Sequence, residues 1–567
     1  MLDRWHAARA TAKDITTDFT TLPAPRTIGR VDGGKQLVAG HFLIAGRELE
    51  IRGRSLWDAA PDDLGVRDAL QSFGWLDDLA ALGTDTARNR AQVWLLQWID
   101  RYGRGGKEGW APDIAGSRML RWINHGPFVL QGLEEAKAAR FRRSIARQTL
   151  YLARRWHSAA PGLPMIRAQV GTIYAACMLE GMITQAGPAA TALATTCQQV
   201  IDTDGAIANR QPETLLEVLT LLNHAWQALS DARQHVPTHL TDTITRIAPT
   251  LRALRHADGS LARFHGGGAG VPGRLDEALA AARTADVPTP GVHMGFVKLT
   301  GARTSVIVDA AAPPKGPDNR DAHASTLAIE VTSGRRPMIV SGGPGQRFGG
   351  DWHRTSRTTA SHSTLVLDGT SSSQLKEMGP AAPLDAPFAT VPSVVNCKLS
   401  DGTGGRTLEL SHDGYRKTYG LTHARIMKLG IDGRQLQCED LLTTLGSVDE
   451  GRFDTMQGRA GEPGLPFSLR FHLHPDVSAA LKAEGTTVSL TLKSGEVWLM
   501  RFEGPVVASL YPSIYFETGR IKPRATQQVV FSGRAMSYAT RVRWSLAKAD
   551  DTPTVVRDLA MADAARP

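Results

Sequence analysis

The sequence predicts two successive domains of different class, a helical domain followed by an antiparallel β-sandwich. Between about residues 61 and 285, apolar side chains recur with the helical period of about 3.6 residues. Beyond Gly291 they alternate with a period of about two residues, and Pro288-Thr289-Pro290 lies where the period changes. A chain of 567 residues is long enough for two or three hydrophobic cores. The predicted fold class is therefore α+β and multidomain.

Paired helices rich in tryptophan and leucine favour an α/α toroid of helical hairpins for the first domain. Trp94 and Trp98 lie one turn apart on an apolar face. The helices show no repeat of about 33 to 34 residues, which argues against ankyrin and tetratricopeptide arrays. Most tryptophans are expected in the core, and a few would line a sugar-binding cleft. The expected helices are at about 89–102, 134–158, 164–186, 188–203, 212–232 and 239–256.

Four segments are expected along the chain. Residues 1–60 form a lead-in with short strand-like pieces, among them residues 36–38, and residues 61–285 form the toroid. Residues 291–549 form the β-sandwich, and residues 550–567 form a weakly ordered tail.

Residues 318–369 contain three predicted strands, with a histidine before the first and another before the third. The strands are expected at 325–331, 336–340 and 363–367. His323 and His362 are the two histidines, and antiparallel pairing can bring them together. The alternative is two unrelated surface histidines.

These strands carry a resemblance to a known family. The segments AHASTLAIEVTSGRRPMIVSGG, ASHSTLVLDG and SHDGYRKTYGLTHARIMKL resemble the C-terminal β-domain of the heparinase II/III family, bacterial lyases that act on uronate-containing polysaccharides. The resemblance implies a toroid and a β-domain with a cleft between them. His323 and His362 match the family pattern, whereas Ser325, Ser341 and Ser363 stand where the family has Asp, Asp and Asn.

The resemblance also implies a catalytic set on the toroid, and that set is incomplete. The family has an Asn-His pair on one helix and a tyrosine about fifty residues later. Arg210 matches the second segment, but Thr214 occupies the tyrosine position. The helix expected to carry the pair, at residues 167–174, lacks it, and an Asn223-His224 pair on another helix is interpreted as capping or core residues.

Cleavage of a uronate glycoside by β-elimination needs a group that neutralises the carboxylate, a base for the C5 proton and an acid for the leaving oxygen. Arg210 is the predicted neutraliser, because a guanidinium pairs bidentately with a carboxylate. An ion pair with a neighbouring acid is the alternative for this arginine. His323 is the predicted base, since imidazole titrates near neutral pH. His265, Tyr174 and Tyr415 are the other candidate proton carriers.

Arg210, His362 and Trp352 are the predicted substrate-binding residues. No metal or other cofactor is expected, because two histidines without a carboxylate rarely hold a divalent ion. The four cysteines are far apart and are interpreted as buried thiols. The Gly-rich stretch at 264–270 lacks the context of a phosphate loop.

The net charge of +9 favours an acidic partner. The sequence has no basic run or nucleic-acid-binding signature, so an acidic polysaccharide is expected rather than nucleic acid. No stretch approaches the roughly 18 apolar residues of a membrane span, and no signal peptide is found. The expected location is cytoplasmic, or periplasmic if a leader was removed, and the oligomeric state is left open.

Two functional hypotheses follow. The first is a polysaccharide lyase that cleaves an acidic uronate-containing glycan by β-elimination. The second is a non-catalytic acidic-glycan-binding or envelope-assembly protein on the same fold. A hydrolase is disfavoured because no pair of carboxylates stands out by its spacing.

Overall fold

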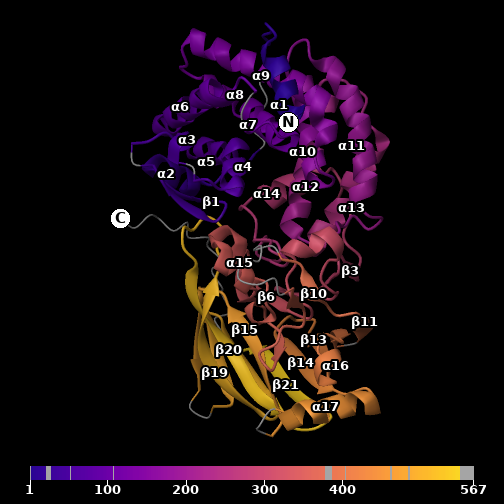
Figure 1. Cartoon of the computed structure of the whole chain (residues 1–567). Helices are drawn as coiled ribbons and strands as arrows, with labels where there is room; N and C mark the ends of the chain where they lie inside the picture. The colour runs from indigo at the N-terminus through magenta and orange to yellow at the C-terminus, as the bar shows by residue number, and fades with distance from the viewer. Residues whose placement is uncertain are drawn as a thin grey trace.

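The computed structural model describes residues 2–20, 27–51, 53–59, 61–105, 108–376, 386–402, 404–459, 463–482 and 485–549. Helices occupy the first half of the chain and antiparallel sheets the second (Figure 1). The predicted fold class, a helical toroid followed by an antiparallel β-sandwich, is confirmed. The tail expected at 550–567 lies outside the described residues.

The helices curve in an arc above the β-domain in Figure 1, with α12 and α14 near the junction. Their bounds are α1 (Leu2–Thr11), α2 (Val31–Ala39), α3 (Leu56–Ala59), α4 (Leu64–Gln71), α5 (Gly74–Leu82), α6 (Asp85–Tyr102), α7 (Pro112–Asn124), α8 (Gly126–Leu130), α9 (Glu135–Arg155), α10 (Leu163–Met178), α11 (Ala186–Val200), α12 (Pro212–Asp231), α13 (Thr238–Ala253) and α14 (Arg274–Ala281).

Tryptophan packing and a close helix contact hold the helical domain together. Trp98, Trp110 and Trp122 are almost fully buried in one apolar cluster, as expected for an aromatic stripe at helical spacing. Helices α7 and α10 touch at Gly116 and Gly171, where a Cβ on Gly171 would lie 2.4 Å from the Cα of Gly116. Only glycine permits this approach, so the backbones of the two helices pack in direct contact.

The lead-in differs from its prediction in one place. Residues 36–38 lie in helix α2 rather than in a strand, so that prediction was wrong. Gly40, with φ of 78°, ends this helix in the left-handed conformation and turns the chain into the hairpin of β1 (His41–Ile44) and β2 (Arg47–Glu50). Leu37 is buried against the toroid, so this apolar residue belongs to the buried face of a helix rather than to a strand.

Two antiparallel sheets form the β-domain. The nine-stranded sheet contains β3 (Val292–His293), β4 (Phe296–Gly301), β5 (Thr304–Asp309), β6 (Ile329–Ser333), β7 (Arg336–Val340), β8 (Leu365–Leu367), β15 (Leu465–Leu473), β19 (Val506–Tyr515) and β20 (Arg524–Ala535). The eight-stranded sheet contains β11 (Val395–Gly402), β12 (Gly405–His412), β13 (Thr422–Leu429), β14 (Gln435–Thr443), β16 (Val477–Leu481), β17 (Thr487–Leu492), β18 (Val497–Glu503) and β21 (Ala539–Lys548).

The core of the β-domain lies between these sheets. Phe471 of one sheet and Trp544 of the other pack with ring centroids 4.7 Å apart. Strand β14 alternates buried and more exposed residues, as its period-two pattern predicts. The sandwich architecture therefore follows from the alternation that the sequence shows beyond Gly291.

Two local differences separate the β-domain from its prediction. Strand β7 has the predicted bounds, but β6 begins at Ile329 rather than at residue 325. Leu327 has a φ of 64°, which no strand accommodates, so the chain turns before β6. Helix α17 (Ser447–Arg459) was not predicted, although Ser447 and Glu450 have the spacing of a capping box.

None of the described helices is both long and apolar enough to cross a membrane. The four cysteines are free, and Cys177, Cys197 and Cys438 are buried, in line with the thiols expected from the sequence.

Candidate functional site

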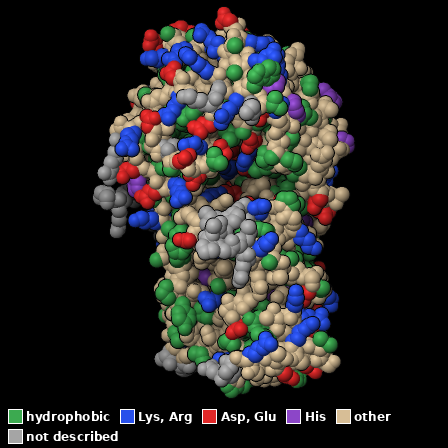
Figure 2. Space-filling model, in the orientation of Figure 1, with side chains coloured by type: hydrophobic (Ala, Val, Ile, Leu, Met, Phe, Trp, Pro, Cys, Tyr) green, Lys and Arg blue, Asp and Glu red, His purple; other side chains and the backbone are tan. Residues whose placement is uncertain are grey.

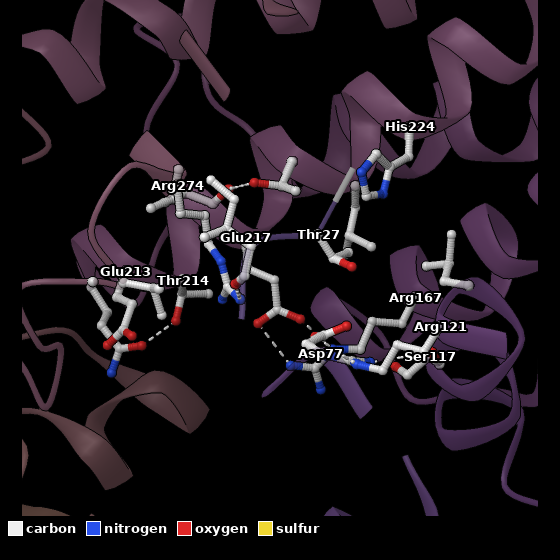
Figure 3. Close-up of a pocket in the computed structure, with 18 of the residues that line it drawn as sticks. Thr27, Asp77, Ser117, Arg121, Arg167, Glu213, Thr214, Glu217, His224 and Arg274 are labelled. Atoms are coloured by element: carbon white, nitrogen blue, oxygen red, sulfur yellow. Dashed lines mark hydrogen bonds and ion pairs between the residues drawn. The ribbon is translucent and has the colours of Figure 1, made fainter. Parts of the chain in front are cut away.

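A cavity of about 310 Å³ opens on the side of the toroid that faces the β-domain. Side chains of α5, α7, α10, α12 and α14 line it, and Arg347 of the β-domain and Thr27 and Ile28 of the lead-in complete its wall. Figure 2 shows a hollow between the helical part and the β part of the molecule, and Figure 3 shows the side chains around the cavity. Its volume lies at the lower end of the range for ligand pockets, about 300 to 1,000 Å³.

Two ion pairs on α12 form one side of this cavity. Arg167 of α10 donates two hydrogen bonds to Glu217, at 2.7 and 2.9 Å. Arg347, from the β-domain, donates to Glu213 Oε2 at 2.7 Å. Burial acts to raise the pKa of both glutamates, but the neighbouring guanidinium groups outweigh it and hold each pKa below its ordinary value. Both carboxylates are therefore ionised at neutral pH.

A third pair lies at the opposite side of the cavity, on α5 and α7. Arg121 donates to Asp77 at 3.1 Å, and His125 Nε2 lies 2.9 Å from the other oxygen of Asp77. Burial acts to raise the pKa of Asp77, but Arg121 and His125 lower it well below its ordinary range. His125 follows Asn124, and the sequence reasoning did not single out this Asn-His pair.

Arg274 is the fourth guanidinium of the lining, and its pairing differs from that of the others. Its hydrogen bond to a described residue runs from Nη2 to the Ile28 carbonyl, at 2.6 Å. It forms no ion pair with a described carboxylate, although its charge helps to lower the pKa of Glu213 and Glu217. Figure 3 shows Glu217 between Arg274 and the arginines of α7 and α10. Arg274 therefore retains donors that a ligand can use.

A polar stripe on α12 faces the cavity and ends at His224. Glu213, Glu217, Thr220 and His224 all line the cavity, and their spacings of four, three and four residues place them on one helix face. Sequence reasoning treated Asn223-His224 as core or capping residues and missed this stripe. The signal was available, because the stripe interrupts a helix that is otherwise rich in leucine.

Tyr174 lies behind His224 rather than in the cavity. Its ring centroid is 6.0 Å from that of His224, its hydroxyl donates to Asn124 Oδ1, and the residue is 2% exposed. The described residues that line the cavity do not include it. Its role as a proton carrier stays a prediction, and a ligand in the cavity would meet His224 first.

His323, His362 and His265 form a separate cluster, buried beneath the junction. His323 Nδ1 and His362 Nε2 share a hydrogen bond of 3.1 Å, so the strands do bring these two residues together. The backbone N–H of His323 donates to His265 Nδ1 at 3.1 Å. Each of the three histidines is 1% exposed, and none is among the described residues that line the cavity.

Burial lowers the pKa of all three histidines. The pKa of His323 and of His265 lies well below the ordinary value, first because of burial and then because of neighbouring positive charge. The pKa of His362 falls to about 4, also chiefly through burial. The cluster is therefore neutral at physiological pH. His362 Nδ1 lies 3.2 Å from the Ser341 hydroxyl, whereas His265 Nε2 and His323 Nε2 have no hydrogen-bond partner among the described residues.

Arg210 joins the toroid to the β-domain. Its Nε and Nη2 donate to the carbonyls of Met294 and Gly295 at 3.0 and 2.9 Å, and Nη1 donates to Ala312 at 2.6 Å. Nη2 also pairs with Asp309, and the residue is 9% exposed. The bridge to a neighbouring acid, the alternative considered for this arginine, is present. Its predicted roles in carboxylate neutralisation and substrate binding are untested.

Residues 285–545 match the family model described as heparinase II/III-like, C-terminal. This range includes strands of both sheets and the buried histidines His323 and His362, which precede β6 and β8. Residues 285–545 therefore form a heparinase II/III-like C-terminal domain. This match agrees with the resemblance carried by the strands around His323 and His362.

Similar proteins cover nearly the whole chain. FtsZ-localized protein C of Caulobacter vibrioides (strain NA1000 / CB15N) is 29% identical over 528 residues, which is 91% of this chain and 88% of that protein. The crystal structure of heparinase III matches with a TM-score of 0.66 at 12% identity, over 95% of this chain and 88% of that one. A mutant of heparan sulfate lyase HepC from Pedobacter heparinus matches with a TM-score of 0.58 at 14% identity, over 97% and 88%. The structural likeness shows a shared fold.

The chain has threonine at the cavity where the family resemblance places a tyrosine. Thr214 lines the cavity and donates to Gln211 Oε1. None of the described residues that line the cavity is a tyrosine. His224 is therefore the cavity's one histidine among those residues, and it has no phenol beside it there.

Serine replaces the family's aspartate at position 325, yet a carboxylate is still close. Ser325 Oγ donates to Asp309 Oδ2 at 2.7 Å, and His265 Nε2 lies 3.6 Å from the same oxygen. Even so, no group of three or more His, Cys, Asp or Glu side chains within the described residues is placed to hold a metal ion. The absence of a metal cofactor stays a prediction.

Tyr415 and Trp352, the two remaining predicted site residues, also lie away from the cavity lining. The Tyr415 hydroxyl donates to the Leu365 carbonyl at 2.8 Å inside the β-domain core, and burial raises its pKa. Trp352, on α15 (Gly350–Ser356), packs its ring 5.6 Å from that of Phe516. Neither residue contacts the arginine-lined cavity, and their roles are untested.

Proposed function

We propose that this protein binds an acidic polysaccharide in the cavity between its toroid, taken as residues 61–285, and its β-sandwich, taken as residues 291–549. Arg274 carries the proposal. Its Nη2 is held by the Ile28 carbonyl, which fixes the guanidinium in the cavity wall without neutralising it. A glycan carboxylate would complete the pairing through a charge-assisted hydrogen bond.

The charge around the cavity supports this class of ligand. The lining holds four arginines against three carboxylates, and the whole chain has a net charge of +9. An acidic polymer would therefore be attracted from a distance and held at short range by Arg274. The similar structures are those of heparinase III and a heparan sulfate lyase, and this supports a polysaccharide over another polyanion.

Calorimetric titration with a panel of acidic glycans tests the proposal. Binding should weaken as salt is raised, since exposed charges are screened over about 8 Å at physiological ionic strength. A panel that includes alternating uronate–hexosamine chains and pure polyuronates covers the main classes. If none of them binds at low salt, the proposal is wrong.

β-Elimination in the same cavity is the second candidate function, and His224 favours it. His224 lies on the same face of α12 as the carboxylates and lines the cavity with Arg274. In this mechanism Arg274 would neutralise the uronate carboxylate and His224 would take the C5 proton. The C4–O4 bond would then break, and O4 would receive a proton from His224 or water. Each cut forms a conjugated double bond, so ultraviolet absorbance reports it.

Binding without cleavage is the preferred function because the cavity lining lacks most of the predicted proton carriers. Thr214 offers no phenol, and the other predicted carriers are buried outside the cavity lining. The relative named FtsZ-localized protein C supports an envelope-assembly role as a companion to glycan binding. Fluorescent tagging of this chain beside labelled FtsZ tests that role, and independent distributions of the two would count against it.

A further inference from the structure

A small cavity of about 130 Å³ lies in the joint between the two domains, apart from the cavity that Arg274 lines. Its lining comes from residues 256–269 at the end of the toroid and from β6, β7, β19 and His474 of the β-domain. Ala269 lines this joint cavity and Gly270 lines the first one, and no described residue lines both. The joint cavity is therefore a separate candidate for a ligand.

Glu330 is a buried acid of the joint cavity whose partners are already in place. Its Oε1 accepts from Arg263 Nε at 3.3 Å and from the Ser341 backbone N–H at 2.9 Å. Its Oε2 accepts from the Arg263 backbone N–H at 3.0 Å and lies 3.3 Å from His256 Nε2. Burial acts to raise the pKa of Glu330, but Arg263 and His256 lower it to about 2. The charges of Glu330 and Arg263 therefore cancel within the protein.

Arg263 nevertheless keeps one donor without a partner. Its Nη2 donates to the Ser341 carbonyl at 2.7 Å, but its Nη1 has no hydrogen-bond partner among the described residues. The residue is 5% exposed, and its guanidinium lies 4.3 Å from the centre of the Tyr515 ring. A buried donor without an acceptor costs free energy, so an oxygen atom of a ligand at this place would be stabilising.

His474 supplies a second donor close to the first. The backbone N–H of Asp476 donates to His474 Nδ1 at 3.2 Å, so the neutral ring carries its proton on Nε2. Burial and then the charge of Arg263 lower the pKa of His474, which keeps the ring neutral at pH 7. Its centroid lies 4.9 Å from that of Tyr515, the same ring that Arg263 contacts. Arg263 and His474 can therefore donate to the two oxygens of one carboxylate.

Asp258 gives the joint cavity a negative charge that no described residue balances. Its Oδ1 accepts from the backbone N–H and the hydroxyl of Ser260, at 3.0 and 2.7 Å. It forms no ion pair with a described residue, although it lines the cavity together with Arg263 and Glu330. A ligand that carries only negative charge would be repelled by this second carboxylate, whereas an ammonium group would pair with it.

We propose that the joint cavity binds a small free amino acid, with its carboxylate at Arg263 and His474 and its ammonium group at Asp258. Such a zwitterion has no net charge, and its two ends match the unpaired donors and the unbalanced acid of the lining. A volume of about 130 Å³ equals the share of about four water molecules, which admits glycine or alanine but no large side chain. The inference does not depend on glycan binding in the first cavity.

Saturation-transfer NMR on the full chain tests the inference with glycine, alanine, acetate and methylammonium as probes. We expect glycine or alanine to bind at least about tenfold more tightly than acetate or methylammonium, because each of these ions has one of the two charged groups. Leucine should bind more weakly than glycine, since its side chain exceeds the cavity. The inference is wrong if neither small amino acid binds at about 10 mM, or if acetate binds as tightly as they do.

A matched pair of substitutions locates the ammonium end of the ligand. Asp258→Asn removes the unbalanced charge, keeps an oxygen for Ser260 and should lower the affinity for glycine about tenfold. Asp286, an exposed acid that does not line the cavity, provides the control, and Asp286→Asn should leave the affinity unchanged. His474→Phe keeps an aromatic ring without the N–H donor and tests the carboxylate end, also where Asp258→Asn fails to fold.

Arg274→Gln distinguishes the joint cavity from the first one. Arg274 is the proposed carboxylate partner in the first cavity, so an amino acid bound there would lose affinity in this variant, whereas binding in the joint cavity should not change. Loss of glycine binding in Arg274→Gln together with full binding in Asp258→Asn would overturn the inference. Unchanged affinity in both Asp258→Asn and His474→Phe would overturn it as well, and neither outcome bears on glycan binding at Arg274.

Discussion

Arg210 of the toroid and Asp309 of β5 form a buried ion pair that ties the two domains together. Arg210 has a φ of 53°, a conformation that costs a non-glycine residue free energy and persists only where the surroundings enforce it. Gly295 leaves room for the guanidinium group, since a Cβ there would lie 2.4 Å from Arg210 Nε. The guanidinium is thus a structural part of the joint, surrounded by backbone on the β-domain side.

Replacing Arg210 by alanine should destabilise the fold rather than weaken ligand binding alone. Asp309, which is 0% exposed, would be left as an uncompensated buried charge, and breaking such a pair costs about 3 to 5 kcal/mol. Urea unfolding measures the change. Arg541→Ala is the control, because its pair with Glu439 is exposed and should contribute less than about 1 kcal/mol. Unchanged stability with lost glycan binding would instead support the role first predicted for Arg210.

Replacing Arg274 by glutamine should reduce the affinity for an acidic glycan by about tenfold or more. The change removes a charge-assisted hydrogen bond to the ligand but breaks no ion pair with a described residue. Titration calorimetry on both forms measures the effect, and the urea midpoint should stay nearly constant. Arg541→Gln removes a charge on the outer sheet face and should leave affinity within about twofold. Equal losses in both variants would mean that overall charge, not Arg274, governs binding.

The fold could be predicted from the sequence because periodicity reports burial directly. Helix α12 and strand β7 begin and end within a residue of their predicted bounds. The sequence also allowed His323 and His362 to lie together, with two unrelated surface histidines as the alternative, and the structure joins them by a hydrogen bond although β8 pairs with β15 rather than with β6. These features depend on the local pattern of apolar residues and on the order of the strands, and both can be read from a single sequence.

The site could be predicted much less well, because exposure depends on contacts between distant segments. His323 precedes a strand, which predicted an accessible position, but loops of the toroid and the β-domain cover it. His224 was set aside because its match to the family was on the wrong helix, although its spacing from Glu213 and Glu217 marked a polar helix face. Nothing in the sequence indicated Arg274. Its proposed role depends on the absence of an ion pair with a described carboxylate, which only the structure shows.

Replacing His323 by alanine should lower stability and leave glycan binding nearly unchanged. The substitution leaves His362 Nε2 without its partner in a buried place, at a cost of about 1 to 3 kcal/mol. Urea unfolding and calorimetry on the same samples measure the two effects. His235→Ala, at an exposed position, should change neither. A large loss of turnover on a cleaved glycan, with stability unchanged, would assign His323 to the chemistry after all.

Incubation of the protein with a tetrasaccharide that alternates glucuronate and N-acetylglucosamine should give binding without a rise in ultraviolet absorbance. A phenol is absent from the described lining, and His224 would have to act as both base and acid. Absorbance of the conjugated uronate measures cleavage directly. A steady rise would favour the second candidate function, and His224→Ala should then lower the rate by about 10²-fold or more while His235→Ala keeps it.

Stability should fall as the pH is lowered from 7.5 to 5.5, because several histidines are buried in the neutral form. Burial lowers the pKa of His362 and of His472 to about 4, and that of His265 and His323 well below its ordinary value. A depressed pKa in the folded state means that the unfolded chain binds more protons below about pH 6.5, so the free energy of unfolding decreases as pH falls. Each of these histidines contributes a loss of about 1.4 kcal/mol over that range, and the four together up to about 5 kcal/mol.

Urea unfolding at pH 7.5, 6.5 and 5.5 measures this loss of stability. The carboxylates of the cavity do not contribute to the change between pH 7.5 and 5.5. Because the pKa of Glu213 and of Glu217 is lowered in the folded state, their contribution to the free energy of unfolding is lost only below about pH 4.5. His362→Gln should remove one histidine's share and flatten the profile by about 1.4 kcal/mol between the two extremes. A profile that stays flat in the unmodified protein would mean that these histidines accept protons in the folded state, and the buried cluster would then have to open to solvent.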